Sequence, residues 1–567
     1  MKQMKWWGWG DPDITFDITA RPALWAYLVN STGIENDRGL KVSNANLESI
    51  KLSEPVLNNN FLKILKGILK PEQMQYDFYE RLIHTYGKSF RDLWRIRNGI
   101  VDRSPDIVCY PGTEEQIQAI VAAATQFDVV LIPFGGGSNI AGCLEPRDCQ
   151  NRMVLSLDMQ HMNKVLEVDS YSMTARIQAG VRGPNMEEQL NQHGMTLGHF
   201  PDSFEFSSIG GWVATRSAGM QSDKYGKMED MVIALKMVTP AGTIVTRPVP
   251  KCSNGIGINQ LCIGSEGIFG VITEVTVQVH HLPARKQFHG WLFPDFESGI
   301  SAVYEATLQN IAPSMTRLND AQKTALSFSY KTRGSFMQQL LSRMLLLHLK
   351  FVKKFSMDKV CLMLAAFEGD NINTQIKKIS AIYKKHGAVP LGTSPGKSFE
   401  KSKYDFPYFR DFVMDYGVTA DVSETATTWK NLLPLYYHTQ KSIQQAIIDT
   451  GSKAWCGCHV SHTYKTGASL YFTFAFKQSS AVLNQYLQVK KSAEDAFIKF
   501  NSTLSHHHAV GYEHMPWISD DISATGIKAV QGIKTTLDPK NIMNPGKIIP
   551  NNFSLTDWGW TGEQECT

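Results

Sequence analysis

The sequence lacks the features of a secreted or membrane-spanning protein. Its nine cysteines are an odd number, spread from Cys109 to Cys566, which is typical of a reduced intracellular protein rather than a disulfide-stapled one. No stretch reaches the roughly 18 apolar residues of a spanning helix. The first ten residues contain no apolar segment of the signal-peptide type, and the last three are not a Ser-Lys-Leu address. We therefore expect an intracellular protein that is cytoplasmic or attached to a membrane surface.

The sequence is also poor in net charge and in potential metal ligands. A net charge of +4 over 567 residues is too small to indicate a nucleic-acid partner. The group Cys456-Gly457-Cys458-His459 lacks the second ligand pair of a zinc site, which favours buried structural cysteines. There is no internal repeat or low-complexity tract, so we expect an ordinary globular protein without a bound metal.

The length is several times what one hydrophobic core requires, which indicates more than one domain. The first hundred residues are polar and irregular in pattern, and a turn-rich segment at 102–106 precedes a change of texture. We place the boundaries so that the segments are 1–102, 103–282, 283–510 and 511–567.

From Ile107 the pattern alternates short strands with helices. Thr113 is expected to cap a helix, with Gln116 closing a capping box. Buried or alternating strands are predicted at 129–132, 153–157, 165–168 and 173–179, and a helix is predicted over 184–193. Beyond Pro283 the pattern indicates longer helices, a strand at 470–476 and a final helical region from Asp521 that stops at Asp538. The texture is that of an α+β protein.

A glycine-rich loop from Pro133 to Asn139 directly follows a buried strand. Glycines at this point allow the backbone to approach a ligand and to direct its N–H groups at an anion such as a pyrophosphate. A tight turn without a ligand is an equally good interpretation of this loop alone. The loop matches neither a P-loop nor a G-x-G-x-x-G fingerprint. Two further small-residue segments, 201–219 and 264–273, favour a ligand site.

These three segments resemble the FAD-binding domain shared by D-2-hydroxyacid dehydrogenases and alkyldihydroxyacetonephosphate synthase, in the vanillyl-alcohol oxidase (PCMH-type) superfamily. The resemblance implies an α+β fold with a helical N-terminal region. It also implies a PCMH-type FAD-binding domain over 103–282, a substrate-binding cap domain over 283–510 and a C-terminal FAD-linked oxidase segment over 511–567.

Other segments resemble the synthase family rather than the dehydrogenases, and the match extends from Lys5 to about Met543. These segments are 4–10, 409–411, 423–425, 471–476 and 505–511. The resemblance implies a transferase that exchanges the acyl group of acyl-dihydroxyacetone phosphate for a long-chain fatty alcohol in ether lipid biosynthesis, with FAD as an electron sink and no net redox change. A homodimer is compatible with it.

The alternative is an FAD-dependent D-2-hydroxyacid dehydrogenase or oxidase. Such enzymes carry Glu-His-Gly-Ile-Gly where this chain has the segment that begins at His506, and this difference favours the transferase. In the other direction, Asn544-Pro545-Gly546-Lys547 resembles the dehydrogenases, and Lys251 replaces an arginine of the synthase family.

The resemblance also implies roles for individual residues. The residues expected to contact FAD are Pro133, Phe134, Gly135, Gly136, Gly137, Ser138, Asn139, Pro201, Asp202, Ser203, Phe204, Glu205, Phe206, Ser207, Ala214, Thr215, Arg216, Ser217, Glu266, Gly267, Ile268, Phe269, Gly270, Val271 and Ile272. Arg410 is expected to bind the substrate phosphate, and Tyr471 to act as the acid/base residue beside His506, His507 and His508.

The chemistry of these residue types agrees with those roles. An arginine can hold a phosphate through two parallel charge-assisted bonds, and a tyrosine with neutral histidines can move a proton next to a ketone. A lone arginine or tyrosine is more often a salt-bridge partner or a core ring. For the three histidines the alternatives are a metal site or a solvated turn, but neighbours on a strand point to opposite faces and bind one ion poorly.

A basic amphipathic run extends from Phe336 to Lys354. Its apolar side chains are Phe336, Leu340, Leu341, Met344, Leu345 and Leu347, and its basic ones are Arg343, Lys350, Lys353 and Lys354. This combination predicts a helix that lies on a membrane surface, where both lipid substrates would be collected. A buried helix with a solvated basic end is the alternative.

Overall fold

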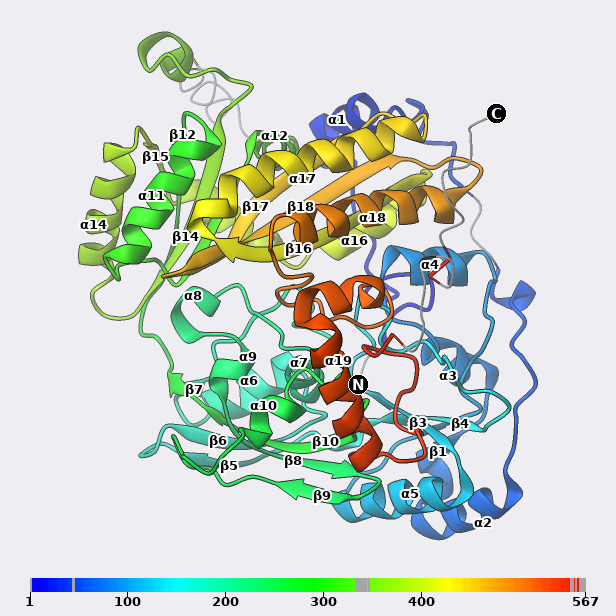
Figure 1. The fold of residues 1–567 in the computed structure, drawn as a ribbon. Coiled ribbons are helices and arrows are strands. Elements are labelled where there is room, and N and C mark those ends of the chain that lie inside the picture. The colour runs from blue at the N-terminus through cyan, green and yellow to red at the C-terminus, as the bar shows by residue number, and fades with distance from the viewer. Residues whose placement is uncertain are drawn as a thin grey trace.

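The computed structural model describes residues 3–42, 46–331, 344, 347–550, 555 and 558–559. They form two lobes, one above the other in the view of Figure 1. The lower lobe contains two main sheets, and the upper lobe contains one sheet of seven strands. The N-terminal region contributes to both lobes, because β1 (Met74–Gln75) joins a lower sheet while α1 (Pro22–Thr32) packs on the upper lobe.

The first sheet of the lower lobe carries the glycine loop at the end of a strand. Its order is β1, β2 (Ile107–Cys109), β4 (Val154–Asp158), β3 (Val130–Phe134), with β2, β4 and β3 parallel. Helices α2 (Asn59–Ile68) and α5 (Glu114–Phe127) pack against it. Two further helices of this region are α3 (Phe78–Ile83) and α4 (Phe90–Arg97).

Most local predictions for this part of the chain are confirmed. Thr113 caps α5 by accepting a hydrogen bond from the Gln116 backbone N–H. The Gln116 side chain, however, accepts from the Gly112 N–H instead of the Thr113 N–H, so the capping box is not closed as predicted. The strand predicted at 129–132 is β3, and it continues into the glycine loop.

The second sheet of the lower lobe is antiparallel and has five strands. Its order is β5 (Val165–Asp169), β6 (Thr174–Gln178), β10 (Val271–Gln278), β8 (Val232–Thr239), β9 (Gly242–Val245). Short elements surround it: α6 (Gly183–Asn191), β7 (Met195–Thr196), α7 (Ile209–Ala214), α8 (Ser222–Tyr225), α9 (Met228–Met231), α10 (Ile258–Cys262) and β11 (His280–His281). One hydrophobic core joins this sheet to the first sheet. The strands predicted at 165–168 and 173–179 and the helix predicted over 184–193 are therefore confirmed as β5, β6 and α6.

The sequence pattern beyond Pro283 predicted mainly helices for the upper lobe. The structure shows instead that this lobe is built on an antiparallel sheet. The strand order is β15 (Val389–Gly392), β12 (Lys286–Phe293), β14 (Cys361–Glu368), β13 (Met315–Asn319), β17 (Trp455–Tyr464), β18 (Gly467–Lys477), β16 (Val418–Thr428). The prediction missed most of these strands, among them β14, which is buried along its whole length. A strand covered on both faces has no apolar/polar alternation and cannot be distinguished from a buried helix by its pattern.

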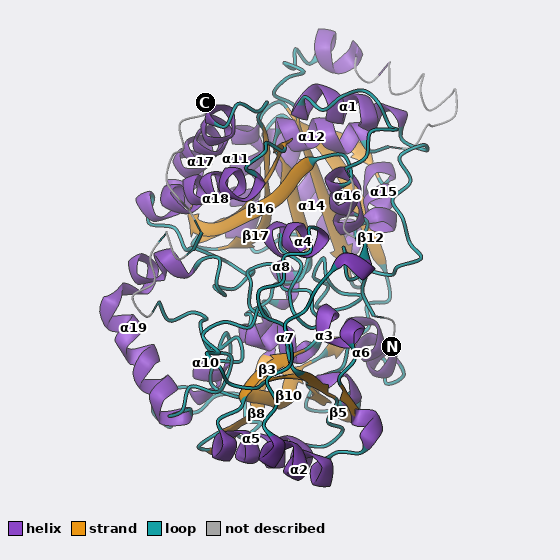
Figure 2. Ribbon diagram, turned by 90° about the vertical axis from the view of Figure 1, so that its right-hand side faces the viewer, coloured by secondary structure: helices purple, strands orange, loops and turns teal. Residues whose placement is uncertain are grey.

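Helices cover both faces of this sheet, as Figure 2 shows. On one face lie α11 (Phe296–Leu308), α14 (Ile372–Lys385), α17 (Trp429–Asp449) and α18 (Val482–Lys499). The opposite face is covered by α12 (Ala321–Ser329), α15 (Ser394–Ser402) and α16 (Phe406–Met414). Alternate residues of β12 serve the two cores, with Trp291 and Phe293 on one side and Leu292 on the other.

The chain returns to the lower lobe through α19 (Ile518–Leu537), the red helix of Figure 1. The Lys534 ammonium fixes its end by donating to the carbonyl oxygens of Ile268 and Met543, at 2.8 and 2.6 Å. Met543 then lies beside Leu131 of β3 in an isolated parallel bridge. The final helix, predicted from Asp521 to Asp538, is confirmed, and it brings the segment that follows it, with Met543 and Asn544, to the glycine loop.

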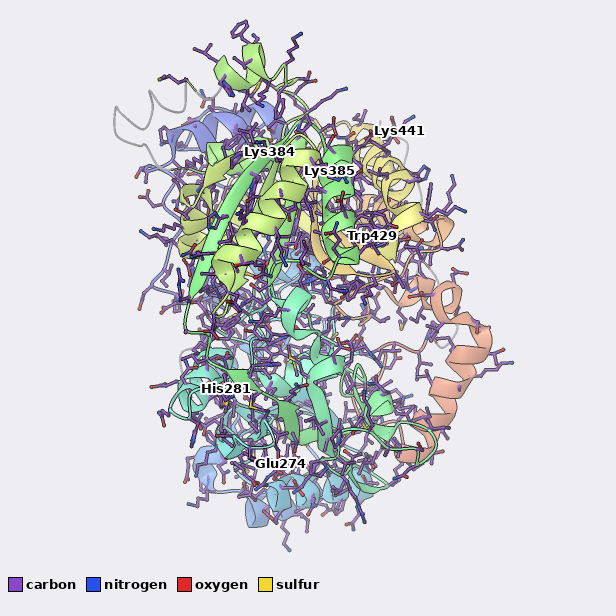
Figure 3. All side chains as sticks on the ribbon, turned by 90° about the vertical axis from the view of Figure 1, so that its left-hand side faces the viewer. Glu274, His281, Lys384, Lys385, Trp429 and Lys441 are labelled. Atoms are coloured by element: carbon purple, nitrogen blue, oxygen red, sulfur yellow. The ribbon has the colours of Figure 1, made fainter. Side chains whose placement is uncertain are left out.

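The outer side of both lobes is seen in Figure 3, where Lys384 and Lys385 of α14 mark the upper lobe and Glu274 and His281 mark the lower one. Lys385 Nζ lies 2.9 Å from Glu305 Oε2 on α11, which ties two outer helices together. Among the described residues, no helix combines the length and the apolar character needed to cross a bilayer.

The predicted interfacial run from Phe336 to Lys354 is only partly within the described residues. Residues 336–343, 345 and 346 lie outside them. The described part ends in a helical turn, His348–Val352, of which Leu349 is buried against the upper lobe.

Candidate active site

A pocket between the lobes is lined by both of them. The lower lobe supplies the glycine loop and parts of the segments 201–219 and 266–272. The upper lobe supplies Arg410, Tyr471, His507 and His508. Residues predicted from distant parts of the sequence therefore meet in one cavity.

The glycine loop has no room for side chains. A Cβ on Gly135 would lie 2.3 Å from Ser208 Oγ, and one on Gly136 would lie 1.8 Å from the Phe206 carbonyl oxygen. Gly137 has a φ of +68°, which disfavours other residues. The bare backbone of this loop lines the pocket, as the close approach of a pyrophosphate requires.

The other two small-residue segments are held against this loop. Glu266 has a φ of +50°, and its carboxylate accepts the backbone N–H groups of Val510 and Gly511, each at 2.7 Å. Asn544 Nδ2 donates to the carbonyl oxygens of Cys143 and Glu266, at 3.0 and 2.8 Å. Asn544 of the ending Asn544-Pro545-Gly546-Lys547 thus forms part of one wall of the pocket.

The structure brings most of the predicted FAD contacts to the pocket wall, but not all. Those on the wall are Pro133, Phe134, Gly135, Gly136, Gly137, Ser138, Asn139, Pro201, Asp202, Ser203, Ser207, Ala214, Thr215, Ser217, Glu266, Gly267, Gly270, Val271 and Ile272. The pocket lining does not include Phe204, Glu205, Phe206, Arg216, Ile268 and Phe269. Phe204, Ile268 and Phe269 belong to the lower core, Phe206 packs on Trp9, and the Arg216 guanidinium donates to Gln260.

The buried carboxylate of Glu424 on β16 organises the three histidines. Its Oε1 accepts the backbone N–H groups of His506, His507 and His508 at 2.9, 3.0 and 3.1 Å. Its Oε2 lies 3.2 Å from His507 Nδ1. The histidines lie in a loop, not on a strand, so the prediction of alternating faces was wrong. A carboxylate that gathers three successive N–H groups bends the backbone and brings the three rings together.

Tyr471 stands directly opposite Glu424 in the register of β16 and β18, and opposite His459 in that of β17 and β18. Paired residues point to the same face of a sheet. The Tyr471 ring accordingly lies 5.3 Å from that of His508 and 5.9 Å from that of His507. His506 is further back, because its nitrogens contact Tyr464 and His507.

Burial sets the protonation of these groups. It raises the pKa of Tyr471 well above its usual value, assisted by the nearby Asp202 and Glu424 carboxylates. Burial also lowers the pKa of His508 well below its usual value. Burial by itself would raise the pKa of Glu424, but His507 and His508 hold the pKa of this carboxyl well below its usual range. At neutral pH the pocket therefore presents a protonated phenol, a neutral imidazole and an ionised carboxylate.

Arg410 on α16 faces the pocket with part of its guanidinium free. Its Nη1 donates to the Lys88 carbonyl oxygen at 2.6 Å, which fixes the side chain. Its Nε and Nη2 are buried without a hydrogen-bond partner among the described residues, although Asp411 Oδ1 lies 3.5 Å from Nη2. Nε and Nη2 form one edge of the guanidinium plane, which is the edge that binds a phosphate through two bonds.

The N-terminal segment 4–10 locks the helix that carries Arg410. The Trp9 backbone N–H donates to Asp411 Oδ2 at 2.5 Å, and the Asp11 N–H donates to the Tyr408 hydroxyl at 3.1 Å. A Cβ on Gly10 would lie 2.1 Å from the Tyr408 hydroxyl oxygen, and Gly10 has a φ of +77°. This explains why a glycine is needed at position 10.

Sequence reasoning missed several residues of this pocket. His459 and His462 of β17 and Arg317 of β13 line it, and Lys323 of α12 lies behind His459. The sequence named His459 only as part of a possible zinc motif and correctly interpreted Cys456 and Cys458 as buried. The eight cysteines in the described part of the chain are all free thiols. The alternation of Cys456, Cys458 and Val460, which belong to the core, with Gly457, His459 and Ser461 is the signal that could have indicated a strand with a pocket-facing histidine.

Comparison with known families agrees with this construction. Residues 105–247 match the FAD binding domain family, and residues 282–548 match the C-terminal domain of FAD linked oxidases. The fold and the pocket thus define an FAD-dependent enzyme. The chain belongs to the alkyldihydroxyacetonephosphate synthase family: it is 38% identical to that synthase of Dictyostelium discoideum over 97% of this chain and 94% of the relative. The Trypanosoma brucei brucei synthase is 37% identical over 97% and 93% of the two chains.

Solved structures show the same fold. A structure of alkyldihydroxyacetonephosphate synthase superposes with a TM-score of 0.84 at 36% identity and covers 96% of this chain and 98% of its own. p-Cresol methylhydroxylase has a TM-score of 0.63 at 14% identity over 88% of this chain and 97% of its own, and shares the fold alone. The mitochondrial D-lactate dehydrogenase (cytochrome) of Arabidopsis thaliana is more distant, at 24% identity over 96% and 91% of the chains. The predicted fold class is confirmed.

The tight fit of the glycine loop predicts loss of FAD when Gly136 becomes alanine. The added Cβ overlaps the Phe206 carbonyl oxygen, and overpacking of this kind costs about 1–3 kcal/mol, or on the order of tenfold or more in affinity. The flavin content per purified chain, measured by absorbance, checks this. Gly67→Ala is the matched control, because Gly67 is an exposed helix residue with nothing within 4 Å of an added Cβ. Equal flavin content in the two variants would contradict the assignment.

Proposed function

We propose that this chain exchanges the acyl group of acyl-dihydroxyacetone phosphate for a long-chain fatty alcohol, with release of a fatty acid, as a step of ether lipid biosynthesis. The observation that carries the proposal is the meeting of a free arginine edge, a buried tyrosine and a histidine cluster opposite the FAD cradle. Bound FAD supplies an electron sink for the reacting carbon and returns to its starting redox state.

Arg410 is the proposed phosphate ligand. Its Nε and Nη2 are free to donate two parallel hydrogen bonds to a phosphate, while Nη1 is held by the Lys88 carbonyl oxygen. The ammonium of Lys88 adds a second buried positive charge nearby, although burial lowers the pKa of Lys88 to about 8. A phosphate bound at this point would orient the carbonyl-bearing part of the substrate toward Tyr471.

Tyr471 and the histidines are the proposed proton carriers. A neutral imidazole accepts a proton, and the lowered pKa of His508 keeps it in that form. A phenol with a raised pKa retains its proton and suits the donor role, which fits Tyr471. We therefore assign removal of the C1 proton, next to the ketone, to the pair His507 and His508. Tyr471 is assigned the role of proton donor.

The same pocket has an apolar end that suits a fatty chain. Beyond Arg410 its wall is formed by side chains of α1, α12, α16 and β17. These are Leu28, Leu326, Phe409, Val413 and Trp455. Burial of such a chain against them stabilises binding by about 0.8 kcal/mol per methylene, which a short hydroxyacid cannot gain.

A direct assay separates the transferase from a hydroxyacid dehydrogenase. Palmitoyl-dihydroxyacetone phosphate and a labelled fatty alcohol should give the ether-linked product and free palmitate, without oxygen uptake or an added electron acceptor. D-Lactate and D-glycerate should leave the flavin spectrum oxidised. Reduction of the flavin by either hydroxyacid, with no ether product from the lipid pair, would establish the redox function instead.

Two conservative variants are expected to affect different steps. Arg410→Lys keeps the charge but loses the two-bond edge, so KM for the acyl substrate should rise about tenfold. Tyr471→Phe removes only the hydroxyl and should lower kcat on the order of 10²-fold. Steady-state kinetics of flavin-loaded enzyme checks both. Parental kinetics in Arg410→Lys, or loss of flavin as the sole defect of Tyr471→Phe, would reject the corresponding role.

We further propose that Met344 and the segment 347–354 contact the surface of an intracellular membrane. Its described side chains Met344, Leu347, Phe351 and Val352 are all more than half exposed. Lys350, Lys353 and Lys354 beside them are exposed as well. Large apolar and basic side chains together on an exposed turn, anchored by buried Leu349, suit the boundary of an anionic bilayer.

Vesicle co-sedimentation tests the membrane contact. Changing Leu347, Phe351 and Val352 to Ser should reduce binding to vesicles that contain anionic lipid, and each lysine should contribute about 1 kcal/mol. The matched control changes Val245 and Ile256 to Ser, since these are equally exposed residues of the other lobe. Equal partitioning of the two flavin-loaded variants would contradict the contact and leave the flavin site unaffected.

A further inference from the structure

His459 lines the pocket but has no part in the reaction described so far. It is the Cα partner of Tyr471 across β17 and β18, and the two rings lie 4.8 Å apart at an angle of 36°. The His459 side chain thus faces the point at which Tyr471 and the histidines act.

A lysine lies directly behind this histidine. Lys323 of α12 is buried, and its Nζ lies 2.9 Å from His459 Nδ1. The approach depends on Gly457, two residues before His459 on the same face of β17. A Cβ at Gly457 would lie 2.8 Å from Lys323 Cγ and 3.1 Å from the Lys323 backbone nitrogen. Any larger residue would push the helix and its lysine away from the strand.

The contact between lysine and histidine has a defined polarity when the lysine is charged; burial lowers the pKa of Lys323 to about 7, so the charged form dominates below that pH. An ammonium group has three donors and no acceptor, so the hydrogen bond runs from Nζ to Nδ1. Nδ1 then carries no proton, and the proton of the neutral ring sits on Nε2, the nitrogen left to the pocket. Burial, with Arg317 and Lys323 nearby, lowers the pKa of His459 well below its usual value, so the ring is neutral at pH 7.

Charged groups on several elements surround this pair. Arg317 of β13 and Asp202 of the lower lobe approach it from the pocket side. Asp320 at the start of α12 accepts the backbone N–H groups of Lys323 and Cys458, each at 2.8 Å. The Tyr436 hydroxyl also donates to Asp320, at 3.1 Å. These bonds fix the first turn of α12 against β17 and hold Lys323 in place.

We propose that His459 is a further catalytic residue, which donates a hydrogen bond from Nε2 to the ketone oxygen of the substrate, and that Lys323 is the positioning residue that selects this tautomer. The inference rests on the proposed function. The ketone is adjacent to the carbon that loses its proton, and His459 lies beside Tyr471, whose ring in turn lies beside His507 and His508, the residues that remove that proton.

The chemical step is the loss of the C1 proton. The proton goes to the histidine base, and the electron pair of the C–H bond shifts so that negative charge develops on the ketone oxygen. His459 stabilises that oxygen without giving up its proton, and no bond to His459 forms. A neutral donor aimed at a developing oxyanion is worth on the order of 10²-fold in rate.

Two amides of the same charge test the role of His459. In His459→Gln the amide nitrogen can occupy the position of Nε2, whereas in His459→Asn the shorter amide replaces Nδ1 and stays near Lys323. We expect His459→Asn to lower kcat on the order of 10²-fold with little change in KM, and His459→Gln to remain within about tenfold of the parent. The same order should hold for exchange of the C1 hydrogen with solvent, measured by mass spectrometry in heavy water. Flavin content and thermal unfolding are measured for each variant.

A double-mutant cycle tests whether Lys323 acts through His459. Lys323→Met should lower kcat about tenfold when His459 is present, because both tautomers of the ring are then populated. In the His459→Gln background it should change kcat less than about twofold, since an amide has no tautomer to select. Lys323→Gln serves as a second variant if Lys323→Met folds poorly. A merely structural lysine would cost the same in both backgrounds.

The outcomes separate the two proposals. A parent enzyme that forms no ether product would overturn the proposed function and this inference with it. An active parent whose kcat is unchanged in His459→Asn, or equally reduced in the Asn and Gln variants, would overturn the inference alone. Equal effects of Lys323→Met in both backgrounds would overturn the positioning role of the lysine.

Discussion

The active site depends on the burial of one carboxylate. Glu424 accepts three successive backbone N–H groups from the loop 506–508 and so determines where three imidazoles lie. A buried carboxylate is tolerated only when it is fully hydrogen-bonded. Glu424 therefore holds the histidine loop in place, and the loop in turn keeps the Glu424 carboxylate ionised. Removing either would disturb Tyr471, which shares the row of side chains with Glu424 across two strands.

Under the proposed function, the lower lobe binds the cofactor and the upper lobe acts on the substrate. The lower lobe offers bare backbone, since glycines bring the loop after β3 against the segment that contains Ser208. The upper lobe offers side chains from a wide sheet, where neighbouring strands place residues in register. Contacts across the boundary, such as Glu266 with Val510 and Gly511, fix the distance between the two sets.

More distant relatives include a D-lactate dehydrogenase, which is 24% identical over 96% of this chain. A fold by itself does not specify the reaction. In this chain the upper lobe supplies an arginine edge without a hydrogen-bond partner among the described residues, an apolar end to the pocket and a cluster of imidazoles. Burial lowers the pKa of His506 and His508 well below its usual value and keeps these two imidazoles neutral, which suits proton transfer at a carbon acid more than the binding of a hydroxyacid carboxylate.

Local chemistry alone determined much of the lower lobe. Thr113 caps its helix, an apolar run forms β3, and glycines mark the loop, because each depends on residues a few positions apart. The resemblance to the synthase family predicted Arg410 and Tyr471 as site residues. The sequence could not give the seven-stranded sheet, because strands buried on both faces show no alternation. Nor could it give the pairing of Lys323 with His459, or of Glu424 with the loop 506–508, which lies more than 80 positions further along the chain. Those contacts depend on strand register and helix packing, and only the tertiary structure fixes both.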